Sequence, residues 1–122
     1  MKAKLKNWYC PDIDDLSNYS PVQSDNFCFL FRAMVGLMEE EGEESFDIQV
    51  CTPQWLITNM KKDDVFCGRH FLIVLEYNFE RIFRKIKNLI ESCTGNDWDE
   101  IAAKVSRIGF WEFEDYEDSK TT

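Results

Sequence analysis

Cys67 and His70 are the residues whose types and spacing could support nucleophilic catalysis, because they lie three positions apart in the segment CGRH. A thiol and an imidazole act together only where a third group orients the imidazole and hydrogen-bond donors stabilise the oxyanion. Nothing in the sequence marks either feature, and His70 is the chain's one histidine. A thiol hydrolase therefore stays an alternative, while we expect His70 to be a structural residue at the start of a strand.

Metal sites are also weakly supported by the spacing of the available ligands. Asp12, Asp14 and Asp15 are spaced like the ligands of a calcium loop, but the glycine and the distant bidentate glutamate of such a loop are missing. Zinc sites usually show closely spaced pairs of cysteine or histidine. The sequence therefore predicts no metal, no cofactor and no enzymatic activity. The five cysteines include no CxxC pair and are scattered along the chain, at Cys10, Cys28, Cys51, Cys67 and Cys93.

The charge of the chain narrows the choice of partner. It carries 23 acidic and 14 basic residues, for a formal net charge of −9. Such a surface repels phosphate backbones and attracts basic proteins, so we expect no nucleic acid as a partner. A simpler explanation is also available, because a net charge of this size keeps a protein soluble.

Length and hydropathy predict the organisation of the chain. Its 122 residues suit a single domain spanning residues 1–122, with a frayed tail from about residue 117. The chain has no run of 18 apolar residues and no signal-peptide core, so we expect no membrane as a partner. An odd number of scattered cysteines is typical of reduced thiols, which predicts a soluble, cytoplasmic protein.

Carboxylates are the most distinctive side chains, and they occur in three clusters. A charge run is usually a solvated face, but carboxylates fixed on a strand would be preorganised to bind Arg and Lys. In FWEFE, residues 110–114, strand alternation predicts that Trp111 and Phe113 face the core. The intervening glutamates then lie on an exposed face. The clusters are Asp12, Asp14 and Asp15; Glu39, Glu40, Glu41, Glu43 and Glu44; and Glu112, Glu114, Asp115, Glu117 and Asp118.

Hydrophobic periodicity predicts an α+β fold. Apolar residues in alternation or in short runs indicate strands at residues 2–9, 27–36, 45–51, 70–77 and 110–114. Apolar residues three and four positions apart, preceded by the cap residues Thr52 and Asp97, indicate helices at residues 53–60, 79–93 and 98–108. This order predicts a mostly antiparallel sheet of about five strands with two to three helices packed on one face.

Two of these strands carry more specific expectations. Ala3, Leu5 and Tyr9 fall on one face of the first strand and are expected to point inward. Residues 27–36 are apolar at odd and even positions alike. That pattern indicates a central strand buried on both faces.

Four segments carry a resemblance to a known family. They are KNWYCPD at 6–12, GEESFDIQVCTPQWL at 42–56, GRHFLIVLEYNFERI at 68–82 and WEFEDY at 111–116. In order and spacing they resemble the immunity protein 8 family of bacterial polymorphic toxin and contact-dependent inhibition systems. The resemblance covers nearly the whole chain, from about residue 3 to 116. Three aromatic residues of these segments are expected in the core: Trp55, Trp111 and Phe113.

The resemblance implies a cytoplasmic bacterial antidote that binds the C-terminal domain of a cognate secreted toxin non-covalently. Many toxins of such systems are nucleases with basic clefts, and an acidic surface that imitates phosphate spacing would occlude such a cleft. We expect the contacts to come from the loop between 27–36 and 45–51, then from the C-terminus, then from the N-terminal cluster. The candidate residues are Glu39, Glu40, Glu41, Glu43, Glu44, Glu112, Glu114, Asp115, Tyr116, Asp12, Asp14 and Asp15.

A small acidic secretion chaperone is the alternative binding function. Such chaperones are similar in size, acidity and α+β composition, but they hold an unfolded effector segment and usually dimerise through a helix. The state of the partner separates the two functions, because an immunity protein binds a folded domain. The sequence itself predicts no oligomeric state.

Overall fold

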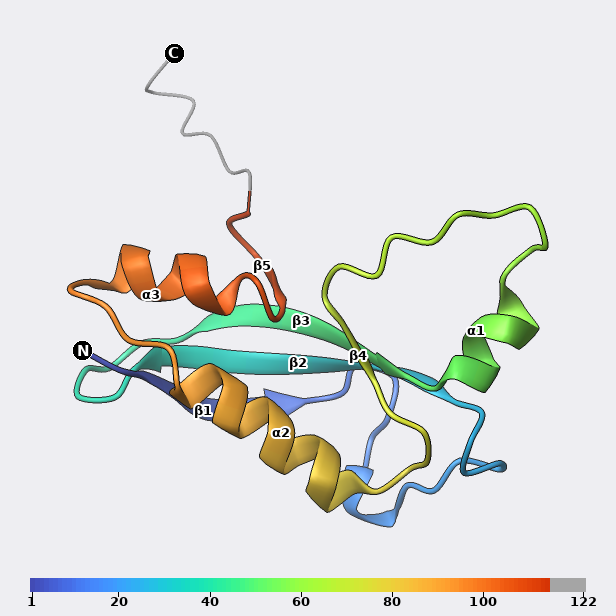
Figure 1. Cartoon of the computed structure of the whole chain (residues 1–122). Helices are drawn as coiled ribbons and strands as arrows, with labels where there is room; N and C mark the ends of the chain where they lie inside the picture. The colour runs from blue at the N-terminus through green and yellow to red at the C-terminus, as the bar shows by residue number, and fades with distance from the viewer. Residues whose placement is uncertain (115–122) are drawn as a thin grey trace.

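The computed structural model describes residues 1–114, except for the side chain of Ser17, and shows a five-stranded sheet with two helices against one of its faces (Figure 1). Strands β1, β2, β3 and β4 follow one another across the sheet, and β5 pairs with β3. All pairs are antiparallel except β3 with β4, which confirms the α+β class and the mostly antiparallel sheet. The elements are β1 (Ala3–Tyr9), the short 3-10 helix η1 (Leu16–Asn18), β2 (Cys28–Leu37), β3 (Glu44–Cys51), α1 (Pro53–Asn59), β4 (Phe71–Ile73), α2 (Phe79–Glu91), α3 (Trp98–Val105) and β5 (Phe110–Trp111).

The hydrophobic core lies between the sheet and the helices α2 and α3. Alternate residues of β2 and β3 point toward the helices, and Phe31 and Phe46 are fully buried there. Helix α2 buries one residue in every four, in a stripe formed by Ile82, Ile86 and Ile90. Each fully buried isoleucine stabilises the fold by about 1.5–3 kcal/mol, so packing rather than helix propensity holds α2 on the sheet.

The predicted helix caps are present and explain where the helices begin. The Thr52 hydroxyl accepts a hydrogen bond from the Trp55 N–H at 3.2 Å, and Pro53 follows as the first residue of α1. The Asp97 carboxylate accepts one from the Glu100 N–H at 2.9 Å at the start of α3. Each helix ends slightly earlier than the sequence predicted. Within residues 1–114, none of the helices is long and apolar enough to span a bilayer.

A β-bulge in β1 reverses one prediction. The pairing register with β2 shifts between Leu5 and Asn7, so the inward positions after the bulge are displaced by one residue. Trp8 therefore faces the core and stacks on Phe31 with 5.5 Å between ring centroids. Tyr9, which strict alternation placed inside, is 46% exposed on the other face. The prediction for Tyr9 is wrong because alternation along one strand contains no information about a bulge.

The strand predicted at residues 70–77 is much shorter than expected. Only Phe71–Ile73 pairs with β3, and the Val74 N–H makes a further hydrogen bond to the Cys51 carbonyl at 3.0 Å. Strand β3 ends at Cys51, where the chain continues toward α1, so the following residues have no strand to pair with. Leu75 is accordingly 75% exposed rather than buried.

The last strand is also shorter than the predicted range 110–114. Strand β5 contains only Phe110–Trp111, and the chain then turns, with the Glu114 N–H donating to the Trp111 carbonyl at 2.9 Å. One more backbone hydrogen bond follows the ladder, from the Glu112 N–H to the Ser45 carbonyl at 3.1 Å, and the chain turns away from β3 after it. The expected alternation of faces through residue 114 is therefore wrong.

The three aromatic residues expected in the core differ in burial. Trp111 is partly buried, packs against the core and stacks on Phe46 with a centroid distance of 6.1 Å. Phe113 is 40% exposed and contacts the edge of Trp111. Trp55 is only partly buried, on α1, which buries none of its residues completely. The prediction of a core position is wrong for Phe113 and for Trp55.

Strand β2 is buried on one face only. Its inward residues are buried under α2 and α3, whereas the outward residues Cys28, Leu30, Arg32 and Met34 remain partly exposed. The predicted burial on both faces is therefore wrong for the part of the chain that the structure describes. Three of these four outward residues are apolar, although solvated sheet faces are usually polar.

Candidate functional site

Residues 39–43 of the loop between β2 and β3 present four exposed carboxylates, and we call this segment the acidic hairpin. None of these four side chains makes a hydrogen bond or ion pair within residues 1–114, which leaves their charges available to a partner. Gly42 has a φ of +107°, a conformation that side-chain-bearing residues rarely adopt. The four are Glu39, Glu40, Glu41 and Glu43.

The backbone around the acidic hairpin is held against the rest of the sheet. The Met38 N–H donates to the Lys2 carbonyl at 3.0 Å, and the Lys6 ammonium donates to the Glu40 carbonyl. On the outward face of β2, a Cβ on Gly36 would lie 2.2 Å from the carbonyl oxygen of Gly42, so glycine is needed where the hairpin folds back. The carboxylates are thus carried on a loop with a defined path.

A hollow of about 350 Å³ lies beside the acidic hairpin. Trp98 from α3 forms part of its lining, together with Val35 and Leu37 from β2. Carboxylate-bearing residues of the hairpin complete the wall. An apolar and aromatic lining next to carboxylates has the chemistry to hold an Arg or Lys side chain.

Glu44 belongs to the same cluster in sequence but has a structural role. Its Oε2 accepts hydrogen bonds from the indole N–H groups of Trp98 and Trp111, each at 2.8 Å. This carboxylate therefore joins α3 and β5 to the first residue of β3. A partly buried acceptor with two donors is expected to stabilise the fold rather than to contact a partner.

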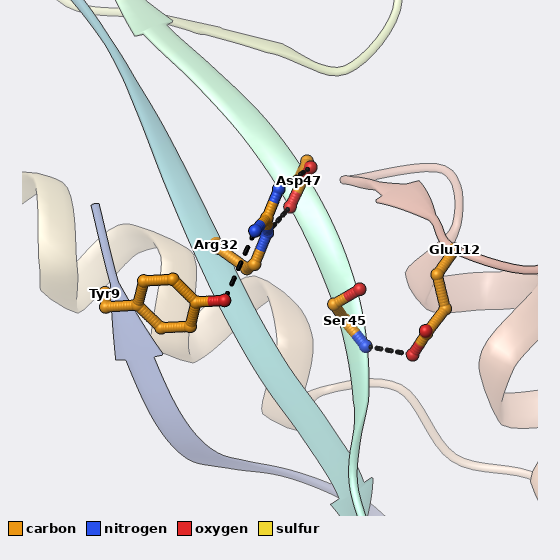
Figure 2. Close-up of polar contacts among 5 residues, drawn as sticks. All are labelled: Tyr9, Arg32, Ser45, Asp47 and Glu112. Carbon is orange, nitrogen blue, oxygen red and sulfur yellow. Dashed lines mark hydrogen bonds and ion pairs between the residues drawn. The ribbon is translucent and has the colours of Figure 1, made fainter. Parts of the chain in front are cut away.

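The C-terminal acids also make internal hydrogen bonds. Glu112 Oε1 accepts from the Ser45 N–H at 2.8 Å, as Figure 2 shows, and so extends the contact between β5 and β3. Glu114 Oε1 accepts from Arg69 Nη2 at 2.9 Å and lies 3.7 Å from His70 Nε2. The Glu114 side chain is only 12% exposed. Glu112 is exposed as predicted and Glu114 is not, and the predicted row of the two on a strand is wrong because the strand ends before them.

The structure brings two of the three clusters together and separates the third. Glu44 and Glu112 both bond to the region where β3 meets β5, next to the acidic hairpin. Asp12, Asp14 and Asp15 follow the other end of β1, away from the hairpin (Figure 1). Asp15 accepts a hydrogen bond from the Asn18 amide at 2.7 Å. The predicted contacts Asp115 and Tyr116 lie outside the described residues.

His70 has the structural role that the sequence predicted. Its Nε2 lies 2.6 Å from the Ser106 carbonyl oxygen, at the end of α3, and its ring meets Phe110 edge-on. Its φ of +66° is unusual for a residue with a side chain, and its carbonyl accepts from the Gln49 N–H at the start of the β3–β4 ladder. Cys67 is exposed on the preceding loop and makes no hydrogen bond to this imidazole within residues 1–114.

Within residues 1–114, the remaining titratable groups form no recognisable reactive centre. Burial raises the pKa of the Cys28 thiol to about 12 and that of Cys10 to about 11, with smaller contributions from Cys51 and Asp12 respectively, so both stay protonated. Among the described residues, no group of three or more His, Cys, Asp or Glu side chains is placed to hold a metal ion.

A polar contact that the sequence did not predict crosses the outward face of the sheet. Arg32 Nε and Nη2 donate to the two carboxylate oxygens of Asp47 at 2.8 and 3.0 Å, and Nη1 donates to the Tyr9 hydroxyl at 3.2 Å (Figure 2). The three residues lie opposite one another on β1, β2 and β3. No local sequence signal reveals this row, because it depends on strand register and on the bulge in β1.

The fold and the exposed carboxylates define a small acidic α+β domain of the kind suited to binding a protein. The chain belongs to the Immunity protein 8 family, whose sequence model matches residues 3–116, nearly the whole chain. This match confirms the resemblance predicted from the four segments. Membership implies an immunity protein, a class of inhibitor, and implies a cognate toxin protein as the partner. No curated protein and no solved structure matches the chain.

Proposed function

We propose that this protein binds the C-terminal domain of a cognate secreted toxin of a polymorphic toxin system and neutralises it in the bacterial cytoplasm. The toxin domain is a nuclease, and its basic active-site cleft is occluded non-covalently by the acidic surface of the immunity protein. The observation that carries this proposal is the acidic hairpin, whose four carboxylates are exposed and have no bonds within the described chain. The family membership supplies the partner's class.

The acidic hairpin fits a basic cleft for two physical reasons. In the proposed complex its carboxylates take the place of nucleic-acid phosphates, because both pair with Arg and Lys side chains. Its backbone is tied to β1, which lowers the conformational entropy lost on binding. A net charge of −9 also steers a basic partner and raises the association rate by about 10 to 1,000-fold.

The hollow beside Trp98 gives the proposal a specific contact. Its volume of about 350 Å³ exceeds that of one long side chain, and it lies between an indole and the hairpin carboxylates. A guanidinium group of the toxin would pair with a carboxylate there while its stem covers the apolar lining. Glu44 contributes by fixing the indole through its hydrogen bond to Nε1.

A growth rescue tests the proposed function. The C-terminal domain of the secreted protein encoded beside this chain is expressed in bacteria with and without the immunity protein, and surviving colonies are counted. Rescue together with a stoichiometric complex on co-purification is the expected result. Rescue without a complex, or a complex with an unfolded segment only, would contradict the proposal and favour the chaperone function.

Two triple variants of equal charge change locate the contact. The hairpin variant is Glu39→Lys/Glu41→Lys/Glu43→Lys, and the control is Asp12→Lys/Asp14→Lys/Asp25→Lys, whose residues are exposed in the segment between the end of β1 and the start of β2. The hairpin variant is expected to slow association by about tenfold or more, with a much smaller effect of the control. Equal losses in the two variants would mean that net charge matters and that the position of the hairpin does not.

A further inference from the structure

The face of the sheet turned away from α2 and α3 carries apolar side chains on β2 at Leu30 and Met34, although polar residues such as Lys4 and Gln49 lie nearer its ends. We call the central part of this face the open face and define it by Tyr9, Leu30, Arg32, Met34, Asp47 and Phe110. Tyr9 is 46% exposed and Phe110 is 50% exposed, while Leu30 and Met34 are partly exposed between them. Within residues 1–114, neither of the two core helices covers these side chains. Exposed apolar groups that gather on one face mark an interaction surface more often than scattered ones do.

Four of these side chains form a single row across the sheet. Strand register places Tyr9 opposite Arg32, Arg32 opposite Asp47, and Asp47 opposite Phe110, so the row crosses β1, β2, β3 and β5. Figure 2 shows the first three side chains directed toward one another. An aromatic ring therefore stands at each end of the row, and an ion pair stands between them.

The ion pair makes the centre of the row easier to desolvate. Arg32 gives two hydrogen bonds to Asp47 and one to the Tyr9 hydroxyl, and its guanidinium carbon lies 5.6 Å from the centre of the Tyr9 ring. The side chains of Arg32 and Asp47 are still 31% and 27% exposed. Because both charges are already paired, a partner covering them leaves no charge unpaired.

The composition of the open face matches the energetic centre of a protein interface. Tyr, Phe, Met and Arg are enriched at interface cores, whereas Lys, Glu and Asp are depleted there. Aromatic side chains bury a large area while losing few rotatable bonds on binding. The open face has two exposed aromatic rings, one Met and one Arg, with a single carboxylate that is already paired.

The acidic hairpin lies at one end of the open face and not at the other. Gly36, at an outward position of β2 next to Met34, lies under the carbonyl of Gly42. The hairpin backbone thus lies at one end of the open face. A partner that covers both must offer an apolar patch beside basic side chains, which is the chemistry expected of a protein surface next to a basic cleft.

We infer that the open face is the main docking surface for the toxin domain, with the row from Tyr9 to Phe110 as its energetic centre and the acidic hairpin as its steering rim. This inference rests on the proposed function, since it names the surface through which that function is exerted. It assigns the two regions different kinetic roles. The open face sets the lifetime of the complex, because desolvated contacts control dissociation, and the hairpin sets the association rate.

Surface-exposed substitutions test the inference with little risk to the fold. The variants Tyr9→Ala and Phe110→Ala each remove a half-exposed ring, and the matched controls Val22→Ala and Ile57→Ala remove apolar groups that are 104% and 72% exposed elsewhere. The probe is the purified, catalytically inactivated C-terminal domain of the secreted protein encoded beside this chain. Association and dissociation rates are measured at low and high salt, and thermal unfolding is recorded for every variant.

The expected result is a dissociation rate raised about 30-fold by Tyr9→Ala or Phe110→Ala, with a nearly unchanged association rate and unfolding midpoint. The controls should stay within about twofold of wild type. Tyr9→Phe keeps the ring and removes the hydroxyl, so it should recover most of the affinity lost in Tyr9→Ala. If Tyr9→Ala lowers the unfolding midpoint, Phe110→Ala at the short strand β5 carries the test alone.

The outcomes separate this inference from the proposed function. If wild type binds the toxin domain and both ring variants bind equally well, the open face is not the docking surface, while the proposed function stands. If wild type does not bind at all, the proposed function fails first. If sedimentation shows a dimer that the ring variants dissociate without loss of toxin binding, the open face is covered by a second copy, which overturns the inference.

Discussion

The acidic hairpin and the turn after β5, residues 112–114, which we call the C-terminal turn, are both rich in carboxylates, yet they use them in opposite ways. The hairpin side chains project into solvent and make no bond within the described chain. Those of the turn accept hydrogen bonds from Ser45 and Arg69. Glu44, at the border between the two regions, accepts from two indoles. Carboxylate density in a sequence therefore does not measure the charge that a surface offers to a partner.

The two segments differ in the hydrogen-bond donors that lie near their carboxylates. The hairpin joins the ends of β2 and β3, and although its backbone contacts Lys6 and Gly36, its carboxylates have no hydrogen-bond donor within residues 1–114. The turn follows β5, which is paired with β3, so its acids lie beside the backbone N–H of Ser45 and the guanidinium of Arg69. A carboxylate next to such donors forms a hydrogen bond that holds the fold, whereas one without a donor stays hydrated and available.

Among substitutions that test the difference between bonded and free carboxylates, Glu44→Ala is expected to have the largest effect on stability. It removes the acceptor of two partly buried indole N–H groups, and hydrogen bonds to a charged group contribute about 1.5–3 kcal/mol each. We expect the free energy of unfolding to fall by about 2–4 kcal/mol, measured by urea titration. The neighbouring Glu43→Ala is the matched control and should change it by less than about 0.5 kcal/mol. Equal effects of the two changes would contradict the division between structural and available carboxylates.

The second prediction concerns charge reversal in the C-terminal turn. The variant Glu112→Lys/Glu114→Lys loses the bond to the Ser45 N–H and places positive charge beside Arg69. We expect a loss of about 1–2 kcal/mol of stability, since Glu112 is exposed and the Arg69 pair is only partly buried. Thermal unfolding measures it. An unchanged unfolding midpoint would show that these contacts do not stabilise the turn. Both carboxylates would then count as available to a partner.

A third, smaller effect concerns Glu91 and the edge of the sheet. Although burial acts to raise its pKa, hydrogen bonds from Lys87 and from the Leu5 N–H lower the pKa of Glu91 below its ordinary value. The folded state therefore binds the proton more weakly than the unfolded chain. The stability from these bonds is fully present above about pH 4.5 and is lost as the pH falls through the lowered folded-state pKa.

Comparison with Glu91→Gln isolates this contribution. Wild type should be the more stable protein at neutral pH, and the difference should shrink as the pH falls into the acid range. Urea titrations from pH 7 to pH 3, spanning the titration range of glutamate, measure the two curves. Parallel curves would show that Glu91 has the same pKa in the folded and unfolded states.

The smallest effect is expected from neutralising one hairpin carboxylate at a time. Glu39→Gln or Glu41→Gln should leave stability within about 0.5 kcal/mol and slow toxin association only about two- to threefold. The reduction should disappear at high salt, because exposed charges are screened. Stopped-flow association at two salt concentrations provides the measurement. A salt-independent loss would indicate a desolvated contact and would place that residue in the docking surface itself.

Much of the fold could be predicted because its signals are local. The starts of α1 and α3 follow from Thr52 and Asp97, whose side chains accept hydrogen bonds from the first turn that follows them. The stripe of isoleucines identified α2, since residues four apart share one helix face. Strands β2 and β3 followed from runs of apolar and alternating residues. Each of these signals is contained within a segment of about 15 residues or fewer.

The main errors concern contacts between distant segments. Tyr9 is outside because β1 contains a bulge, and residues 74–77 are unpaired because β3 ends at Cys51. The acids of the turn are bonded because Ser45 and Arg69 happen to lie beside them. Periodicity gives the face on which a side chain lies only for as long as the strand continues and its register does not shift.

The sequence by itself determined the class of fold, the helices, the excess of negative charge and the family to which the chain belongs. Each of these depends on residue type and on spacing along the chain. Only the tertiary structure decided which carboxylates remain free and which face of the sheet stays open with the row from Tyr9 to Phe110. Both depend on where strands stop and on which donors come near, and long-range pairing fixes these outcomes rather than local propensity.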